Sequence, residues 1–264
     1  MISETATAAA AGNRLLLALP GEGRERLLRL SEHVALAAGQ TLYNAGGQIR
    51  HVYFPASGAV ATAVAMEDGA QVEVCLTGRE GFVGLPALLG HRAASNSRAV
   101  VLAAGEAVRV GAETFAREFA DAEPFRGLVL RYVLALVEEV SQSSACHRLH
   151  TVEARLARWL LEFGDRAGRD ELILTHVLIA AMLGVRREGV TEIVGRLTRD
   201  GLISHCRCRI IFRDRAGLEA RACECYQAVK SLLADLYETG PGVVRQRFYG
   251  EATRRLPAEG RHSL

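Results

Sequence analysis

The sequence lacks several features that would place it in large protein classes. No apolar run approaches the roughly 18 residues that a membrane-spanning helix needs, and the longest, at 177–185, is interrupted by Gly184. The net charge is only +2, so the overall charge does not indicate a nucleic-acid partner. No basic residue precedes Arg14, unlike in a secretory leader. We therefore expect a cytoplasmic protein that does not contact a membrane.

Motifs of common catalytic sites are also missing. The chain has no Gly-rich Walker loop, no Gly-x-Ser-x-Gly elbow and no His-x-His pair of the kind found in cupin-like metalloenzymes. Six cysteines in 264 residues do not make a disulfide framework, so we expect reduced thiols. These absences argue against an enzyme.

What the sequence contains is a change of pattern along the chain. Helices are predicted at 13–19, with Asn13 as the cap, and at 22–31. From about Val34 to Val110, short apolar runs alternate with turns, and Asp68-Gly69 is a strong hairpin signal. The predicted strands are 41–43, 51–54, 58–66, 71–76, 99–102 and 107–110. Many short strands at this spacing predict a small barrel or jelly roll.

A long helix is predicted from Phe125 to about His147, after a shorter helix at 113–120. Its apolar residues recur in steps of three and four, which fits a heptad-like seam. Periodicity alone leaves open whether this helix packs on its own domain, and its position between two domains favours a dimer helix. The expected dimer contacts are Phe125, Val129, Tyr132, Leu136 and Val140.

The segment 174–203 carries the main functional signal. Thr175 is a suitable N-cap for a first helix, and Gly184 suits a turn that needs a positive φ. A second helix is predicted from Arg186 to about Arg199, with an apolar inner face at Val190, Ile193, Val194 and Leu197. Two short helices joined by a Gly turn indicate a helix-turn-helix.

The outward face of the second helix has the chemistry to contact DNA, although any surface helix can carry Arg and Glu. Arg donates two hydrogen bonds to guanine, and Glu accepts one from cytosine. A local excess of arginine provides the attraction to phosphate, and strand 209–212 predicts a wing. The predicted DNA-contacting residues are Thr175, Arg186, Arg187, Glu188, Thr191, Glu192, Arg196, Arg207 and Arg209. A final helix is expected at 217–237.

From about Asn13 to Tyr237 the chain resembles the Crp/Fnr family of transcription regulators. His51-Val52-Tyr53-Phe54-Pro55, Asp68-Gly69 and the segment 78–84 are similar to the family's cyclic-nucleotide-binding-type β-roll. The helix-turn-helix and the preceding segment 155–160 are similar to its C-terminal domain. The resemblance implies a homodimer on near-palindromic double-stranded DNA, with recognition helices about 34 Å apart, and RNA polymerase as a partner.

The family's recognition helix uses an Arg-Glu pair and a further Arg one turn later. Arg187-Glu188 match the pair, while Glu192 replaces the later Arg, so the half-site need not be the one that cyclic-AMP receptors recognise. Arg186 or Arg196 is the alternative source of that contact.

The resemblance also bears on the effector, because the cyclic-nucleotide subgroup grips ribose with a Gly-Glu pair and phosphate with an Arg-Ser or Arg-Thr pair. Here Gly84 is followed by Leu85-Pro86, and neither Arg92 nor Arg98 stands in the family's context. We therefore expect an effector other than cyclic AMP, with another nucleotide or no ligand left open. The expected pocket residues are Gly84, Leu85, Ser95, Ser97 and Arg98.

Neither a metal nor a cofactor is expected. The oxygen-sensing subgroup has an N-terminal cysteine cluster, whereas the first cysteine here is Cys75. Zinc sites favour two to four residues between paired cysteines, but Cys206-x-Cys208 and Cys223-x-Cys225 have one. On a predicted helix, Cys223 and Cys225 would point to different sides. The roles of these four cysteines stay open, including a redox role at the wing.

The sequence therefore predicts an α+β protein with an N-terminal β-roll or jelly-roll sensor domain, a long dimerisation helix and a C-terminal winged helix-turn-helix domain. The expected boundaries are a flexible segment at 1–12, the sensor at 13–123, the dimer helix at 124–148, the DNA-binding domain at 149–239 and a flexible tail at 240–264. The alternative is a cyclic-nucleotide-responsive signalling module that does not bind DNA.

Overall fold

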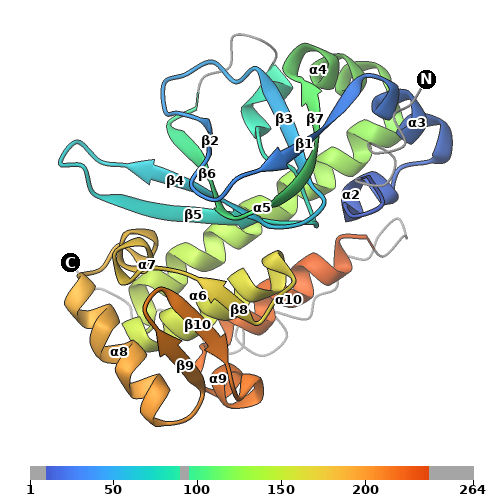
Figure 1. The fold of residues 1–264 in the computed structure, drawn as a ribbon. Helices are drawn as coiled ribbons and strands as arrows, with labels where there is room; N and C mark the ends of the chain where they lie inside the picture. Colours follow the sequence, from blue (N-terminus) through green and yellow to red (C-terminus); the bar gives the residue numbers. More distant parts are fainter. Residues whose placement is uncertain (1–9, 90–94, 238–264) are drawn as a thin grey trace, which may run out of the picture.

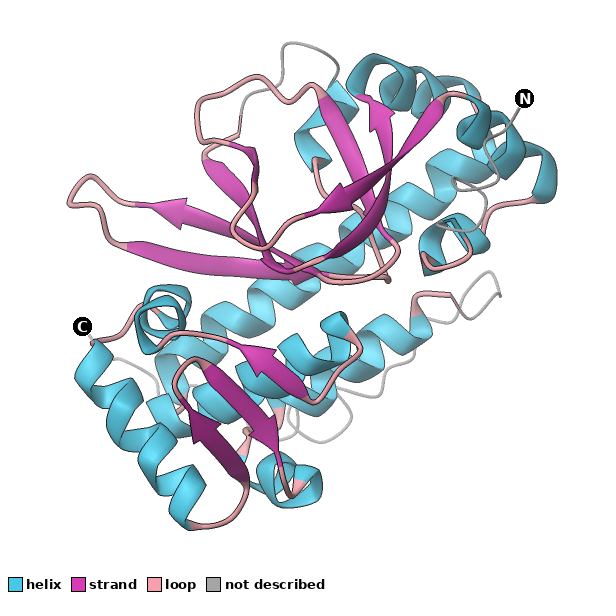
Figure 2. Cartoon of the chain, in the orientation of Figure 1, coloured by secondary structure: helices cyan, strands magenta, loops and turns pink. Residues whose placement is uncertain are grey.

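The computed structural model describes residues 10–89 and 95–237, in two domains on either side of one long helix (Figures 1 and 2). The N-terminal domain begins with helices α2 (Arg14–Leu17) and α3 (Gly21–Arg29). Its strands are β1 (Ser31–Leu36), β2 (Thr41–Tyr43), β3 (His51–Pro55), β4 (Ala59–Ala65), β5 (Gln71–Thr77), β6 (Ser97–Ala103) and β7 (Gly105–Gly111). A 3-10 helix, η1 (Leu85–Leu89), lies between β5 and β6.

These strands form two antiparallel sheets with the orders β1-β7-β3 and β2-β6-β4-β5. The β4–β5 hairpin turns at Gly69, whose φ of +84° requires the freedom of glycine. Asn13 caps α2 by accepting from the Leu16 amide at 3.0 Å, and its Nδ2 donates to the carbonyls of Pro55 and Gly81. The predicted β-rich domain and its strands are confirmed, and β1 is an additional strand that the sequence pattern does not predict.

The long helix is α5 (Glu123–Leu149), which follows α4 (Ala112–Asp121). Phe125, Val129 and Tyr132 are each at most 4% exposed and lie in the N-terminal domain's own core. The prediction that these three residues contact a dimer partner is therefore wrong. Periodicity identified the buried face of the helix correctly, but that face packs against the helix's own domain.

A different face of α5 carries exposed apolar side chains. Leu130, Leu134 and Val137 are 50%, 52% and 57% exposed, and Val140 is 36% exposed. Leu136, also expected at the dimer contact, is only partly buried against the domain core. Leu130, Leu134 and Val137 are spaced by four and three residues, and Ser141 and Ser144 continue the same stripe. We call Leu130, Leu134, Val137, Ser141 and Ser144 the α5 stripe.

The C-terminal domain contains five helices and one small sheet within the described residues. The helices are α6 (Val152–Ala167), α7 (His176–Leu183), α8 (Arg187–Arg199), α9 (Arg215–Arg221) and α10 (Cys225–Asp235). The sheet has the order β8-β10-β9, with β8 (Glu171–Ile173), β9 (Ile203–Cys206) and β10 (Arg209–Phe212). Strand β8 was not predicted.

The final helix was predicted as one element and is two. The chain leaves the helical conformation at Ala222 (φ −70°, ψ 156°) and resumes it at Cys225. Cys223 therefore precedes α10, and the expectation that a shared helix separates Cys223 from Cys225 is wrong. Both thiols are buried and face the same cluster.

The two domains share one hydrophobic core. Leu76, Ala59 and Leu102 of the N-terminal sheet belong to the same buried cluster as Trp159 and Leu160 of α6. The Trp159 indole donates from Nε1 to Oε2 of Glu73 on β5, at 3.0 Å. Burial raises the pKa of Glu73 to about 8, although the hydrogen bond from Trp159 acts in the opposite direction. The interface therefore favours a protonated Glu73.

Residues 1–9 and 240–264 of the two expected flexible termini lie outside the described residues, as does Arg92. Among the residues described, no helix is both long enough and apolar enough to cross a bilayer.

We expect replacement of Glu73 by Gln to flatten the dependence of stability on pH. Because the pKa of Glu73 is raised by folding from an ordinary value of 4.5, its contribution is fully present below about pH 4.5 and is lost as pH rises towards 8. Glu73→Gln keeps an acceptor for Trp159 and stays neutral, so its melting temperature at pH 8 should exceed that of the wild type by several degrees. Thermal unfolding between pH 5 and pH 8.5 measures this.

The control is Glu67→Gln, in the exposed β4–β5 turn. It should follow the wild-type curve at every pH. Parallel curves for Glu73→Gln and the wild type would contradict the role given to Glu73.

Candidate nucleic-acid interface and effector cavity

Helices α7 and α8 form a helix-turn-helix whose local geometry was predicted. Thr175 caps α7 through its Oγ1, which accepts from the Leu178 amide at 3.1 Å. Gly184 ends α7 in the left-handed region with a φ of +63°. The predicted inner face of α8 is buried, at Val190, Ile193, Val194 and Leu197. This packing leaves the opposite face of α8 on the surface.

The first turn of that face carries groups free to contact a ligand. Arg186 is the residue before α8, and Arg187 and Glu188 begin it. All three are exposed, and within the described residues the side chain of none of them makes a hydrogen bond or an ion pair. Two unpaired guanidinium groups beside a carboxylate can bind both phosphate oxygens and base edges.

Further along the helix, the predicted contacts are already engaged within the chain. Arg196 donates from Nε and Nη2 to Glu153 of α6, at 3.0 and 2.9 Å, and from Nη1 to Glu192 at 2.7 Å. Since its donors are used in this way, Arg196 joins α8 to α6 and is not a free base contact. The suggestion that Arg196 replaces the family's second arginine therefore loses support.

Thr191 is likewise held inside the domain. Its hydroxyl donates to the Arg187 carbonyl at 3.1 Å and lies 2.9 Å from Nδ1 of His176. The ring of His176 stacks on His205 of β9, with centroids 4.6 Å apart. Burial lowers the pKa of His176, and the neighbouring His205 adds to this effect. This histidine pair connects the helices to the wing, and nothing in the local sequence pattern pointed to it.

The wing is the β9–β10 hairpin. Arg207 occupies its turn with a φ of +56° and is exposed, with no ion pair among the described residues. Arg209 pairs instead with Glu171 of β8 at 3.1 Å, although its side chain is 59% exposed. The wing therefore presents one unpaired guanidinium group at its tip and a second one that is shared with a carboxylate.

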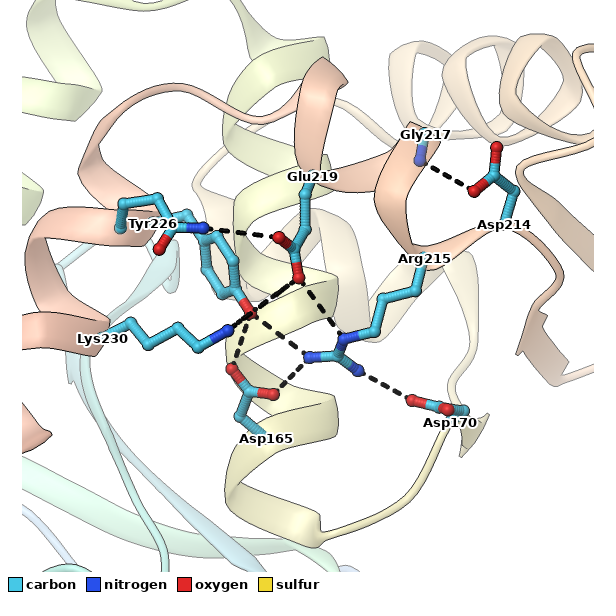
Figure 3. Close-up of polar contacts among 9 residues, drawn as sticks. Asp165, Asp170, Asp214, Arg215, Gly217, Glu219, Tyr226 and Lys230 are labelled. Atoms are coloured by element: carbon cyan, nitrogen blue, oxygen red, sulfur yellow. Dashed lines mark hydrogen bonds and ion pairs between the residues drawn. The ribbon is translucent and has the colours of Figure 1, made fainter.

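Behind the wing, Arg215 anchors the base of the hairpin (Figure 3). Its guanidinium pairs with Asp165 of α6 and lies 2.7 Å from Asp170. The Tyr226 hydroxyl donates to Asp165 at 2.9 Å, and Arg215 lies over the ring of Phe212. The local excess of arginine is thus partly used inside the domain, as Arg196 and Arg215 both show.

The N-terminal domain contains a cavity of about 400 Å³ between its sheet and α5. Four of the five predicted pocket residues line it, namely Gly84, Leu85, Ser95 and Ser97, and Arg98 does not. The hydroxyls of Ser95 and Ser97 lie 2.7 Å apart. Val133, Leu136, Val137 and Val140 of α5 close one side. Among the described residues no charged side chain lines this cavity.

Comparison with known proteins agrees with this arrangement. Residues 33–122 match the cyclic nucleotide-binding domain family, and residues 154–221 match the Crp-like helix-turn-helix domain. The chain belongs, by both domains and their order, to the Crp/Fnr type of transcriptional regulator. None of the curated proteins compared matches it in sequence.

Solved structures of Crp/Fnr proteins have the same fold. A Crp-family transcriptional regulator from Thermus thermophilus is 28% identical, with a TM-score of 0.60, over 72% of this chain and 96% of that one. A putative Crp/Fnr-family regulator from Eubacterium rectale is 18% identical, with a TM-score of 0.63, over 80% of this chain and 98% of that one. The cyclic-di-GMP-responsive regulator CLP from Xanthomonas campestris is 16% identical, with a TM-score of 0.61, over 73% of this chain and 99% of that one.

In this Crp/Fnr-type chain we expect Arg196→Ala and Arg207→Ala to have different consequences. Removing Arg196 should lower the melting temperature, because it disconnects α8 from Glu153, and should leave the dependence of DNA affinity on salt unchanged. Removing Arg207 should leave the melting temperature unchanged and reduce the slope of log affinity against log salt by about 1, the loss of one phosphate contact. Thermal unfolding and titration of labelled duplex at several salt concentrations measure both.

A slope that falls in Arg196→Ala while the melting temperature stays constant would show that Arg196 contacts DNA directly.

Proposed function

We propose that this regulator binds double-stranded DNA as a homodimer on a near-palindromic site. The observation that carries the proposal is the exposed first turn of α8, where the side chains of Arg186, Arg187 and Glu188 have no partner among the described residues. Such a turn fits the major groove, where Arg recognises guanine and Glu recognises cytosine. Thr175 and Arg209 at the edges of this surface belong to the proposed phosphate contacts, together with Arg207.

The α5 stripe supports the dimer. Leu130, Leu134 and Val137 would otherwise leave a row of large apolar side chains in water. Their steps of four and three residues fit a two-helix seam, in which each side chain packs against the partner helix. The partner helix is the same stripe of a second copy, because a two-fold interface uses one patch twice.

The division that we propose is a sensor at 13–123, a dimer helix at 124–148 and a DNA-binding domain at 149–239. RNA polymerase is included as a partner because a DNA-bound regulator acts on transcription through it. A regulatory rather than an enzymatic role, and a cytoplasmic location, are parts of the same proposal.

The decisive experiment is selection from a random duplex pool with the purified protein and no added ligand. We expect an inverted repeat, a dimeric mass in solution and a steep loss of affinity with salt. Arg187→Glu should lower the affinity for the selected duplex by at least tenfold, since it reverses a charge where base and phosphate contacts meet. Anisotropy titration of the selected duplex measures the loss.

Arg117→Glu is the matched control, because Arg117 is an exposed arginine on α4, outside the C-terminal domain. It should bind like the wild type. If the wild type enriches no sequence, with or without cyclic nucleotides, the proposal that this protein binds DNA is wrong. Binding of a cyclic nucleotide in that case would favour the signalling module.

For the sensor we propose an uncharged, largely apolar effector in the cavity against α5. The proposal rests on the lining, in which Tyr43, Ser95 and Ser97 supply hydroxyls and, among the residues that the structure describes, no charged side chain is present to face a phosphate. A cavity of about 400 Å³ falls in the usual range for small-molecule sites. A phosphate buried there would lack a compensating cation, so cyclic AMP should bind poorly.

Calorimetry should show no binding of cyclic AMP or cyclic di-GMP at micromolar concentrations. The neutral fluorescent probe N-phenyl-1-naphthylamine should bind, and Leu136→Phe should weaken it several-fold by filling the cavity. Leu149→Phe, at the exposed end of the same helix and outside the α5 stripe, is the control and should bind normally. Micromolar affinity for either nucleotide would overturn this assignment.

A further inference from the structure

Four metal-ligating side chains meet where the long helix joins the DNA-binding domain. Cys146 lies in the last turn of α5, and His150 is the residue that directly follows the helix, with its amide donating to the Cys146 carbonyl. Cys223 lies between α9 and α10, and Cys225 is the first residue of α10. The three sulfur atoms and the ligating histidine nitrogen all lie within 4.8 Å of one another. The three cysteines are buried and none forms a disulfide.

The separations match the edges of a tetrahedral zinc site. Zn–S bonds of about 2.3 Å and Zn–N bonds of about 2.0–2.1 Å imply S···S edges of about 3.8 Å and S···N edges of about 3.6 Å. The sulfur atoms of Cys146 and Cys223 are 3.5 Å apart. Sγ of Cys225 is 3.6 Å from Nδ1 of His150. Two opposite edges of the tetrahedron therefore already have the required length.

The surroundings of the four ligands favour metal binding as well. Nε2 of His150 lies 3.2 Å from Oε1 of Glu224, so a proton held there leaves Nδ1 free to face the sulfur atoms. This is the carboxylate–histidine–metal arrangement that orients ligands in zinc proteins. Gln142 donates from Nε2 to Sγ of Cys225 at 3.0 Å, which stabilises a thiolate.

We propose that Cys146, His150, Cys223 and Cys225 bind one Zn²⁺ ion per chain in a closed structural site. On binding, each cysteine thiol loses its proton to solvent and each sulfur donates an electron pair to the metal, so no electron is transferred. Zinc with three thiolates carries one net negative charge. The guanidinium of Arg158 lines the same small cavity as Cys146, so it lies near enough to offset part of that charge.

Two other uses of the cluster fit the observations less well. A disulfide between Cys146 and Cys223 would need an oxidant and would leave Cys225, His150 and Glu224 without a role. An iron–sulfur cluster holds at least two of its ligands on different irons and so farther apart than the 4.8 Å within which all four groups lie here. A single ion uses all four groups at the distances observed.

A metal bound at this location would affect how α5 and the C-terminal domain are joined. It would bridge α5 to the α9–α10 segment, while the partly buried Ala154 of α6 packs against the same cluster. The metal would therefore fix the junction through which α5 and the winged helix are connected. The inference depends on this geometry alone and does not require the proposed DNA binding.

The test starts with the full-length protein, purified under reducing conditions without chelator. Elemental analysis should give about one zinc per chain. After removal of zinc, titration with Co²⁺ should produce the intense visible bands of tetrahedral cobalt and a thiolate charge-transfer band, saturating at one equivalent. This readout uses the wild type, so it does not depend on the folding of a variant. DNA binding is measured in a separate assay. A protein that fails to bind DNA can still give the expected zinc content and cobalt spectrum, so the two proposals are tested independently.

Cys223→Ser and His150→Ala should bind less than one tenth as much zinc after desalting and should melt at lower temperature. The matched control is Cys206→Ser with Cys208→Ser, which changes two exposed thiols of the wing and should keep one zinc per chain. Absence of tetrahedral cobalt bands in the wild type would overturn the proposal. So would stoichiometric iron with sulfide, or a Cys146–Cys223 disulfide in freshly purified protein.

Discussion

The placement of the two domains depends on one buried arginine. Arg166 of α6 is 7% exposed, and its Nε donates to the Leu76 carbonyl at 3.0 Å. The same guanidinium pairs with Glu80 of the N-terminal domain at 2.8 Å and with Glu139 of α5 at 3.0 Å. One side chain thus joins the N-terminal domain, α5 and α6. Removing it would leave two carboxylates buried without a cation, which costs far more than a surface pair does.

The local backbone is adapted to this arginine. A side chain at Gly78 would meet the backbone of Arg166 at 2.8 Å, so only glycine lets α6 approach this closely. Glu80 in turn accepts from the Gly78 amide at 2.8 Å, which fixes its carboxylate beneath the guanidinium. Burial still raises the pKa of Glu139 to about 7. The interface therefore holds more carboxylate than its cations neutralise, and this makes it responsive to protonation and to small movements of α5.

The local parts of this structure could be predicted from sequence, because each signal lies within a few residues. Thr175, Gly184 and the inner face of α8 specify the helix-turn-helix without reference to the rest of the chain. Phe125, Val129 and Tyr132 show the limit, since periodicity reveals that a face is buried but not what covers it. The metal-ligand cluster was missed for a related reason. Cys146 and Cys223 are 77 residues apart, and only the fold, with its break at Ala222, brings them together.

The same limit explains why the local count of arginines overestimates the number of guanidinium groups that are free on the surface. Arg196 and Arg215 look like surface cations in the sequence, yet each is held by carboxylates that α6 supplies, Glu153 and Asp165. Helix α6 therefore makes contacts on both sides: its Arg166 binds the N-terminal domain and α5, and its carboxylates hold α8 and the base of the wing.

The direction of the recognition helix is thus set by how α6 lies on α5. In the dimer that we propose, two half-sites one helical turn apart could be met together only if α6 keeps that position in both protomers. The effector that we propose for the cavity would contact Val137 and Val140, which lie on the same turn of α5 as Glu139. A shift of that turn would reach α8 through Arg166 and α6, without any contact between effector and DNA.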